Sequence, residues 1–162
     1  MLRDMRRETS EAHIRDLVKR LRAGIPGLAI RTTFIAGFPG ETDAQFETLL
    51  GFIEEAKFDR MGIFTYSQEQ GSRAAKMDGQ IPATVKKSRY RKAMAAQQKI
   101  AKERAASLVG KKVRVLVDTP DTARTEADAP DVDGKVLLQN PLSPGTFAEV
   151  TITGHTIYDL IA

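Results

Sequence analysis

The residues best placed to do chemistry form a glycine- and proline-rich turn, Gly37-Phe-Pro-Gly-Glu-Thr42, directly after an apolar, β-branched run that ends at Ala36. Glycines let a ligand approach the backbone closely. The helix that follows begins with free N–H groups suited to a carboxylate or phosphate. The ordinary alternative is a tight turn in which Glu41 and Thr42 cap the helix. The turn alone favours this alternative, because it is neither a Walker loop nor GxGxxG.

Two further sites are weaker candidates. Tyr66 ends a second apolar run and can lie against a planar ring, although a tyrosine at a strand end is more often a packing residue. Arg6 and Arg7 can bind a carboxylate or form a solvated surface pair. The chain has no cysteine and only two histidines, which excludes disulfides and thiolate metal sites and disfavours a histidine-rich one.

Charge is distributed unevenly along the chain. Residues 85–108 carry eight Lys or Arg against one acid, whereas residues 111–162 carry five against eight acids. The basic segment either grips nucleic-acid phosphates or is a solvated helix face, and both interpretations stay open. The acidic segment lacks the ligand order of a calcium loop, so it is either a surface loop or a docking site for a basic protein. Its four clustered acids are Glu126, Asp128, Asp131 and Asp133.

The elements that position the turn alternate between helix and strand. Helical periodicity covers residues 10–25, a strand runs over 28–36, a helix with a Thr42/Gln45 capping box follows, and a second strand covers 60–66. This order predicts parallel strands joined by a right-handed crossover. A parallel sheet needs further strands and cover on both faces. The series starts on a helix without a preceding strand, so we expect the back portion of a larger α/β unit.

A polar loop at 67–80 precedes a long helix at about 82–109, and Gly110 marks the boundary. Short strands expected at 113–117, 134–139, 147–153 and 156–161 predict a small antiparallel barrel. The predicted domains are therefore 1–110 and 111–162. No apolar stretch approaches the roughly 20 residues of a membrane span and no secretory signal is present, so cytoplasm is the default location.

Several segments together resemble the radical S-adenosylmethionine methylthiotransferases, and the resemblance covers nearly the whole chain. Residues 111–162 look like the TRAM barrel that ends these proteins. The segment 124–134 and the closing Tyr158-Asp-Leu160 are similar to the branch that methylthiolates an aspartate of small-subunit ribosomal protein twelve. The other matching segments are Met5-Arg-Arg7, Ile30-Arg-Thr-Thr-Phe-Ile-Ala-Gly-Phe-Pro-Gly-Glu-Thr42, Phe58-Asp-Arg-Met-Gly-Ile-Phe-Thr-Tyr-Ser67, Gln97-Gln98 and Leu108-Val-Gly-Lys111.

The resemblance implies an α/β fold: the C-terminal part of a partial (β/α) radical-SAM barrel whose strand ends hold S-adenosylmethionine, followed by the TRAM-like barrel. By position, the residues bordering this cofactor are Arg7, Thr33, Ile35, Gly37 and Tyr66. The family also holds two [4Fe-4S] clusters through cysteines that this chain lacks. We therefore expect no metal ligands and no catalytic residue here, a polypeptide that is inert alone, and an N-terminal portion of the enzyme as its missing partner.

Charge helps to choose a target within the family. An acidic barrel suits a basic ribosomal protein better than RNA. We therefore expect the acidic loop, through Glu126, Asp128, Asp131 and Asp133, to contact ribosomal protein twelve. The alternatives are a tRNA-modifying relative, a stand-alone module that binds RNA through the basic helix, and a non-functional fragment from a broken gene or an incomplete sequence.

Overall fold

The computed structural model describes all 162 residues and divides them into two compact units, Met1–Gln97 and Gln98–Ala162. The division falls inside helix α3 (Ala83–Leu108), which therefore contributes residues to both units. The long helix expected at 82–109 is confirmed, but the second unit begins before Gly110, because Ala105 and Leu108 pack into its core. None of the α-helices has the length and apolar character that crossing a bilayer requires.

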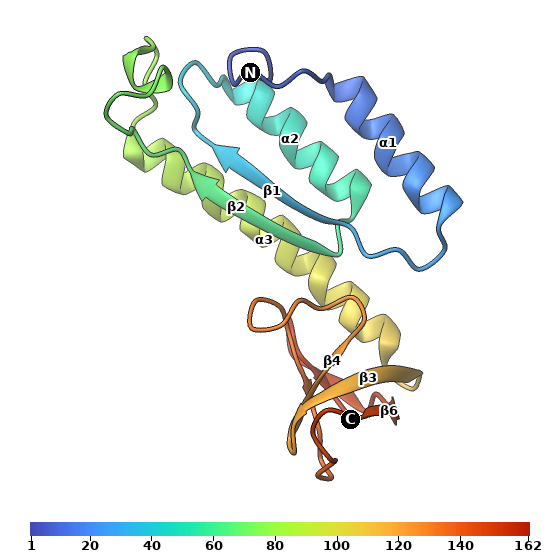
Figure 1. Cartoon of the computed structure of the whole chain (residues 1–162). Helices are drawn as coiled ribbons and strands as arrows, with labels where there is room; N and C mark the ends of the chain where they lie inside the picture. Colours follow the sequence, from blue (N-terminus) through green and yellow to red (C-terminus); the bar gives the residue numbers. More distant parts are fainter. The chain divides into compact units, whose positions relative to one another are not determined.

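The first unit is a β–α–β unit with an additional helix before it (Figure 1). Strands β1 (Arg31–Ala36) and β2 (Arg60–Thr65) pair in parallel, as the sequence predicts. Helix α1 (Glu11–Gly24) begins at the Ser10 cap, and α2 (Asp43–Ala56) begins at the expected Thr42/Gln45 capping box. The capping groups satisfy N–H groups that the first helical turn leaves without partners.

The two faces of this small sheet differ in burial. On one face, Phe34 makes edge contacts with the rings of Phe52 and Phe58, and Ile14 and Val18 of α1 pack on the same cluster. The opposite face carries Thr33, Ile35 and Phe64, and the side chains of Ile35 and Phe64 are 44% and 65% exposed. Because successive side chains of a strand alternate between faces, the helices cover the Phe34 face and leave the other open.

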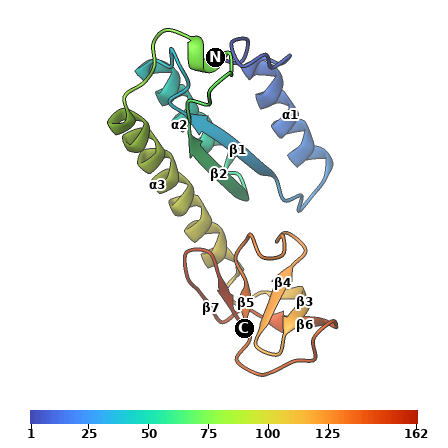
Figure 2. The same ribbon diagram turned by 60° about the vertical axis from the view of Figure 1, so that its left-hand side comes forward.

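The second unit is a curled six-stranded sheet in the order β6-β3-β4-β5-β8-β7 (Figure 2). Strands β6 and β7 lie at opposite ends of this order, yet only Ile152 and Thr153 separate them in the chain, so the sheet closes on itself. Its core combines strand residues with Ala105 of α3. The strands are β3 (Lys112–Thr119), β4 (Thr122–Thr125), β5 (Val136–Leu137), β6 (Phe147–Thr151), β7 (Gly154–His155) and β8 (Leu160–Ile161).

The expectation of a purely antiparallel barrel is wrong in one pairing, since β5 and β8 run parallel. The chain between them passes through β6 and β7, at the two ends of the strand order, and returns in the original direction. Strand β4 was not expected, because Ala123 is its only buried residue and its neighbours Thr122 and Arg124 show no apolar alternation. The expected loop at 67–80 contains a single short 3₁₀ helix, η1 (Ala74–Lys76).

Candidate functional site

The candidate site lies at the carboxyl ends of β1 and β2, where open α/β sheets bind their ligands. The turn after β1 places Gly37 and Gly40 at φ +76° and +80°, a region in which a Cβ is strained. The Gly37 N–H donates to Glu41 Oε1 at 2.9 Å, and the Gly40 N–H donates to Gly79 O at 2.9 Å. These N–H groups and that of Thr42, which donates to Gln45, already have protein acceptors. These hydrogen bonds close the turn, so these N–H groups are not offered to an anion. Thr42 caps α2, as the ordinary alternative holds, but Glu41 does not, because its carboxylate turns back to the Gly37 N–H.

A buried arginine that the sequence did not single out holds this turn. Arg89 of α3 donates from Nη1 to Glu41 Oε1 at 2.6 Å and from Nη2 to Asp43 Oδ1 at 2.7 Å. Its guanidinium also lies 5.6 Å from the ring centroid of Phe46. Burial alone would lower the pKa of Arg89, but hydrogen bonds and charge from Asp43 and Glu41 outweigh it and raise that pKa. The sequence signal that could have identified Arg89 is its spacing, because it lies four residues before the buried Ala93, on the same face of the helix.

A second side chain of α3, Lys86, brings two predicted residues together. Its Nζ donates to Tyr66 O at 2.9 Å and stands 4.9 Å from the Tyr66 ring centroid. The stem of Lys86 lies against Gly37, where a Cβ would be 2.4 Å from Lys86 Cγ. The Tyr66 ring also makes an edge contact with Phe38 at 5.4 Å. Gly37 and Tyr66 are thus neighbours at the strand ends, and the ring of Tyr66 packs against Phe38.

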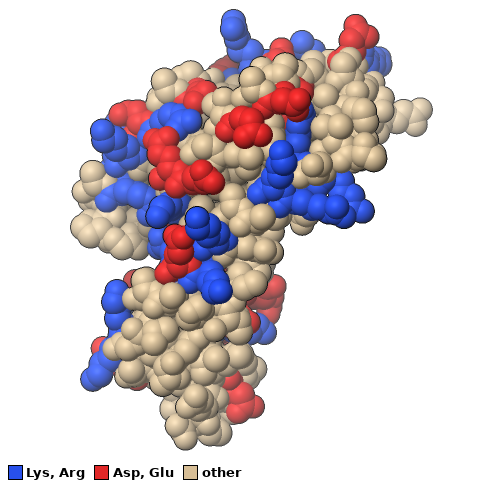
Figure 3. All heavy atoms as spheres, turned by 180° about the vertical axis from the view of Figure 1, so that it is seen from behind, with Lys and Arg blue, Asp and Glu red and all other residues tan.

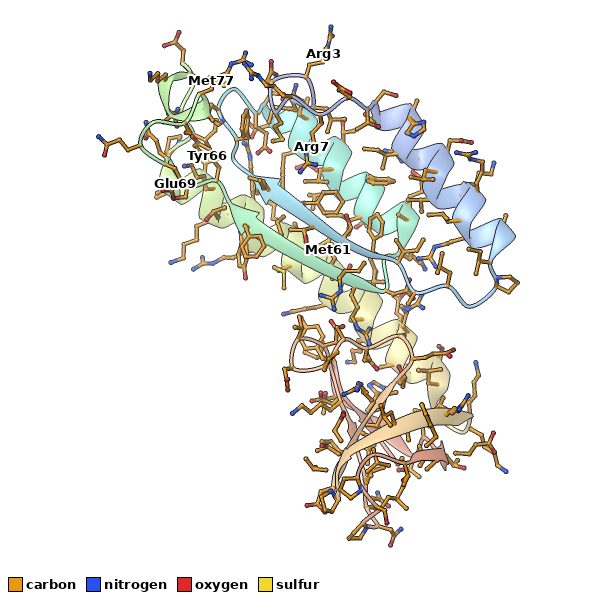
Figure 4. The ribbon with its side chains drawn as sticks, viewed as in Figure 1. Arg3, Arg7, Met61, Tyr66, Glu69 and Met77 are labelled. Carbon is orange, nitrogen blue, oxygen red and sulfur yellow. The ribbon has the colours of Figure 1, made fainter.

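The other predicted cofactor residues lie apart from this pair. Thr33 and Ile35 share the open face of β1, and Thr33 stands opposite Gly62 of β2. Arg7 has an exposed side chain. The segment that carries it lies at the end of the unit toward which β1 and β2 point (Figures 1 and 4). The structure thus brings together Gly37 with Tyr66 and Thr33 with Ile35, and it places Arg7 at the same end of the sheet.

The open face combines accessible backbone with apolar side chains. A Cβ built on Gly62 meets only the Thr33 side chain, at 3.7 Å, so the backbone there is accessible to a planar group. Ile35 and Phe64 flank this position with apolar surface, and Thr33 adds a hydroxyl. The hydroxyl of Tyr66 is buried without a hydrogen-bond partner. The open face thus offers accessible backbone at Gly62, apolar flanks and the Thr33 hydroxyl.

The same residues do not fit an iron–sulfur cluster. Such clusters are bound by cysteine thiolates, and this chain has none. No group of three or more His, Asp or Glu residues converges as a metal site would require. Two hollows of the surface lie elsewhere, one lined by α1 and α2 around Phe52 and one lined by α2 and α3 around Phe46 and Arg89. The candidate site is therefore an open strand face.

The four acids of the predicted partner site have two different environments. Asp128 Oδ2 accepts from Thr125 N at 3.2 Å and Thr125 Oγ1 at 2.5 Å, and Asp133 Oδ2 accepts from Ala129 N at 2.7 Å. These two carboxylates shape the loop. Glu126 and Asp131 are exposed, and Asp131 takes a left-handed conformation with φ +60° at the tip.

Similarity to known proteins covers the entire chain. Residues 109–162 match the TRAM domain family. The chain is 56% identical over 162 residues to ribosomal protein uS12 methylthiotransferase RimO of Opitutus terrae, covering all of this chain and 34% of that protein. Proteins of the same name from Akkermansia muciniphila and Pelotomaculum thermopropionicum are 47% and 48% identical, with 100% and 99% of this chain and 36% and 38% of theirs covered. The chain thus spans about a third of the length of these relatives and matches their C-terminal third.

Proposed function

We propose, from the premise that the whole chain corresponds to the C-terminal portion of a RimO protein, that it forms part of a methylthiotransferase acting on ribosomal protein uS12. In this proposal, the first unit contributes part of the S-adenosylmethionine site and the second unit contacts the protein target. The observation that carries it is the similarity to proteins of that name, which extends through both compact units.

The geometry of the first unit supports a segment of (β/α) barrel wall. Its two parallel strands are joined by α2, with helices on one face only. In a (β/α) barrel, the helix-free face of the sheet points to the interior, and ligands bind at the carboxyl ends of the strands. In this role, Ile35 and Phe64 exclude water from the bound cofactor and Thr33 offers it a hydrogen bond. When bound, S-adenosylmethionine supplies the methyl group and the radical chemistry.

In our proposal, this chain does not bind the iron–sulfur clusters. The chain supplies no thiolate, so the residues that hold the clusters would come from a portion of the enzyme with cysteines. We propose that this polypeptide is catalytically inert by itself and that its activity requires that portion as a partner.

Charge supports a protein target for the strands and loops of the second unit that follow α3. Residues 111–162 carry five basic against eight acidic residues, which favours a basic partner such as a ribosomal protein. We narrow the predicted contact to the exposed Glu126 and Asp131, because Asp128 and Asp133 are engaged in shaping their own loop. A ribosomal target would also place the protein in the cytoplasm, as expected from the sequence.

The alternative of nucleic-acid binding rests on α3. Figure 3 shows Lys and Arg side chains along this helix with acidic side chains among them. Lys86 and Arg89 are turned inward to the strand ends, which leaves the outer residues Lys87, Arg91, Lys92, Lys99 and Lys102 exposed. If these residues grip phosphates, affinity for RNA should fall steeply with salt and should not need the ribosomal protein.

A chimera tests the proposal. The chain would replace the matching C-terminal third of the Opitutus terrae protein, which is 56% identical to it. We expect the chimera to restore methylthiolation of uS12 in a strain that lacks its own RimO, as read by the mass of uS12. A matched chimera that carries a tRNA-modifying relative's C-terminal third is the control. A stable, cluster-loaded chimera without activity on uS12 would contradict the proposal.

A further inference from the structure

We propose that Arg89 is a positioning residue: through Glu41, it holds the turn after β1 in the geometry that the cofactor site requires. This inference rests on the proposed function, because it assigns the turn to the S-adenosylmethionine site. Arg89 lies on α3, well outside the segment that forms the turn, and its contacts are with Glu41, Asp43 and the Phe46 ring. Its effect on a ligand would therefore pass through Glu41.

The contacts form a short chain from α3 to the end of β1. Arg89 Nη1 donates to Glu41 Oε1 at 2.6 Å, and the same oxygen accepts from the Gly37 N–H at 2.9 Å. Arg89 Nη1 also donates to the carbonyl oxygen of Glu41 at 3.2 Å. Gly37 follows Ala36, the last residue of β1, and lies two residues after Ile35 on the open face. A change at Arg89 thus reaches the strand end through two hydrogen bonds.

Burial makes this arrangement dependent on the arginine. The side chains of Arg89 and Glu41 are 7% and 5% exposed. A buried carboxylate that loses its cation is strongly disfavoured and turns to water or takes up a proton. Either response weakens the bond from the Gly37 N–H. The turn would then lose the contact that fixes Gly37 at φ +76°.

The fork of the guanidinium explains why the residue is arginine. One nitrogen serves the buried Glu41, and the other serves Asp43, whose side chain is 94% exposed. A lysine has a single point charge and cannot hold both carboxylates in this fixed geometry. Lys86 supports the same turn separately, with its stem against Gly37. The Lys86 contact should therefore persist when Arg89 is changed.

The first test measures the turn directly in this chain. Amide hydrogen exchange at Gly37 should be at least tenfold faster in Arg89→Gln than in the unchanged chain, with Arg89→Lys between the two. Lys92→Gln is the matched control, because it removes a positive charge from the same helix at a residue that is 61% exposed and 4.0 Å from Glu47. Equal exchange at Gly37 in Arg89→Gln and Lys92→Gln would overturn the proposal.

The second test separates positioning from simple loss of stability. In the active chimera, Arg89→Gln should raise the KM for S-adenosylmethionine about tenfold while the KM for uS12 stays unchanged, and Arg89→Lys should recover part of the loss. Glu41→Gln should have a similar effect, and the double variant should be no worse than either single one, because both residues act through one contact. If both KM values rise together and the fraction of folded protein falls, the role of Arg89 is structural only and the proposal is overturned. An inactive unmodified chimera would instead count against the proposed function and leave the exchange test to decide on Arg89.

Discussion

Gly134 lies so close beneath the carbonyl group of Tyr158 that a Cβ on Gly134 would stand 2.0 Å from that oxygen. The contact joins the end of the acidic loop to the turn before β8. Next to it, the Lys135 N–H donates to Asp159 Oδ1 at 2.9 Å, and the Leu160 N–H donates to Lys135 O at 2.9 Å. The backbones of the two segments are thus in direct contact, with no room for a side chain between them.

Gly134→Ala should therefore destabilise the second unit, by about 1–3 kcal/mol, as is typical of overpacking. The matched control is Gly154→Ala in the same unit, where a Cβ would meet Ile161 Cδ1 at an ordinary 3.5 Å. Amide hydrogen exchange of β3 and β5 measures the effect on the unit itself. Equal protection in both variants would show that the Tyr158 carbonyl can move away at little cost.

The two faces of the first sheet should respond differently to truncation. Ile63→Ala should cost about 2–5 kcal/mol, because Ile63 is 5% exposed and its loss leaves a cavity. Ile35→Ala should cost less than about 1.5 kcal/mol, since its side chain is 44% exposed. In the chimera, Ile35→Ala should nevertheless raise the KM for S-adenosylmethionine. Denaturant unfolding and steady-state kinetics give the two readouts, and an unchanged KM would remove Ile35 from the site.

Local signals predicted the first unit well. Apolar periodicity and capping residues located α1, α2, β1 and β2, because these elements are defined by neighbours in the sequence. The short strands of the second unit were harder to predict. β4 buries only Ala123, and the parallel pairing of β5 with β8 depends on the path of the intervening chain. Neither feature leaves a periodic pattern in the sequence.

In the candidate site, too, positions within one strand could be predicted, whereas contacts between distant segments could not. The resemblance named Thr33 and Ile35 as cofactor residues, and the structure places both on one face of β1 and leaves that face open. The contacts from Lys86 and Arg89 were not predicted, because they join residues about 20 and 48 positions apart. The sequence presented these residues as part of a basic helix, and only the tertiary structure turns them inward.

The acidic loop should separate binding from folding. Reversing Glu126 and Asp131 to Lys should weaken binding to uS12 at low salt, because exposed charges attract an oppositely charged partner and speed its association. The stability of the chain should change little, because both side chains are exposed. Replacing Asp128 and Asp133 by Asn should mainly loosen the loop, because these carboxylates accept hydrogen bonds from Thr125 and Ala129 within it. Titration calorimetry with uS12 and thermal unfolding provide the comparison. Unchanged affinity in the Glu126→Lys/Asp131→Lys variant would refute the electrostatic contact.

The purified chain should not cleave S-adenosylmethionine by itself. After incubation with iron, sulfide and a reductant, we expect no 5′-deoxyadenosine above the level of a protein-free control, because no thiolate is available to hold a cluster. Chromatographic detection of the nucleoside measures this directly. Turnover that depends on iron and scales with the concentration of the chain would contradict the proposed dependence on a cluster-bearing portion.

The closure of the second sheet has a consequence for how the chain behaves in concentrated solution. Because β6 leads into β7 within two residues, this sheet presents no long row of free N–H and C=O groups to other molecules. In the first unit, β1 and β2 pair only with each other, so each keeps one unpaired side. Self-association of the chain should therefore start by strand addition at β1 or β2, while the barrel stays folded within the aggregates.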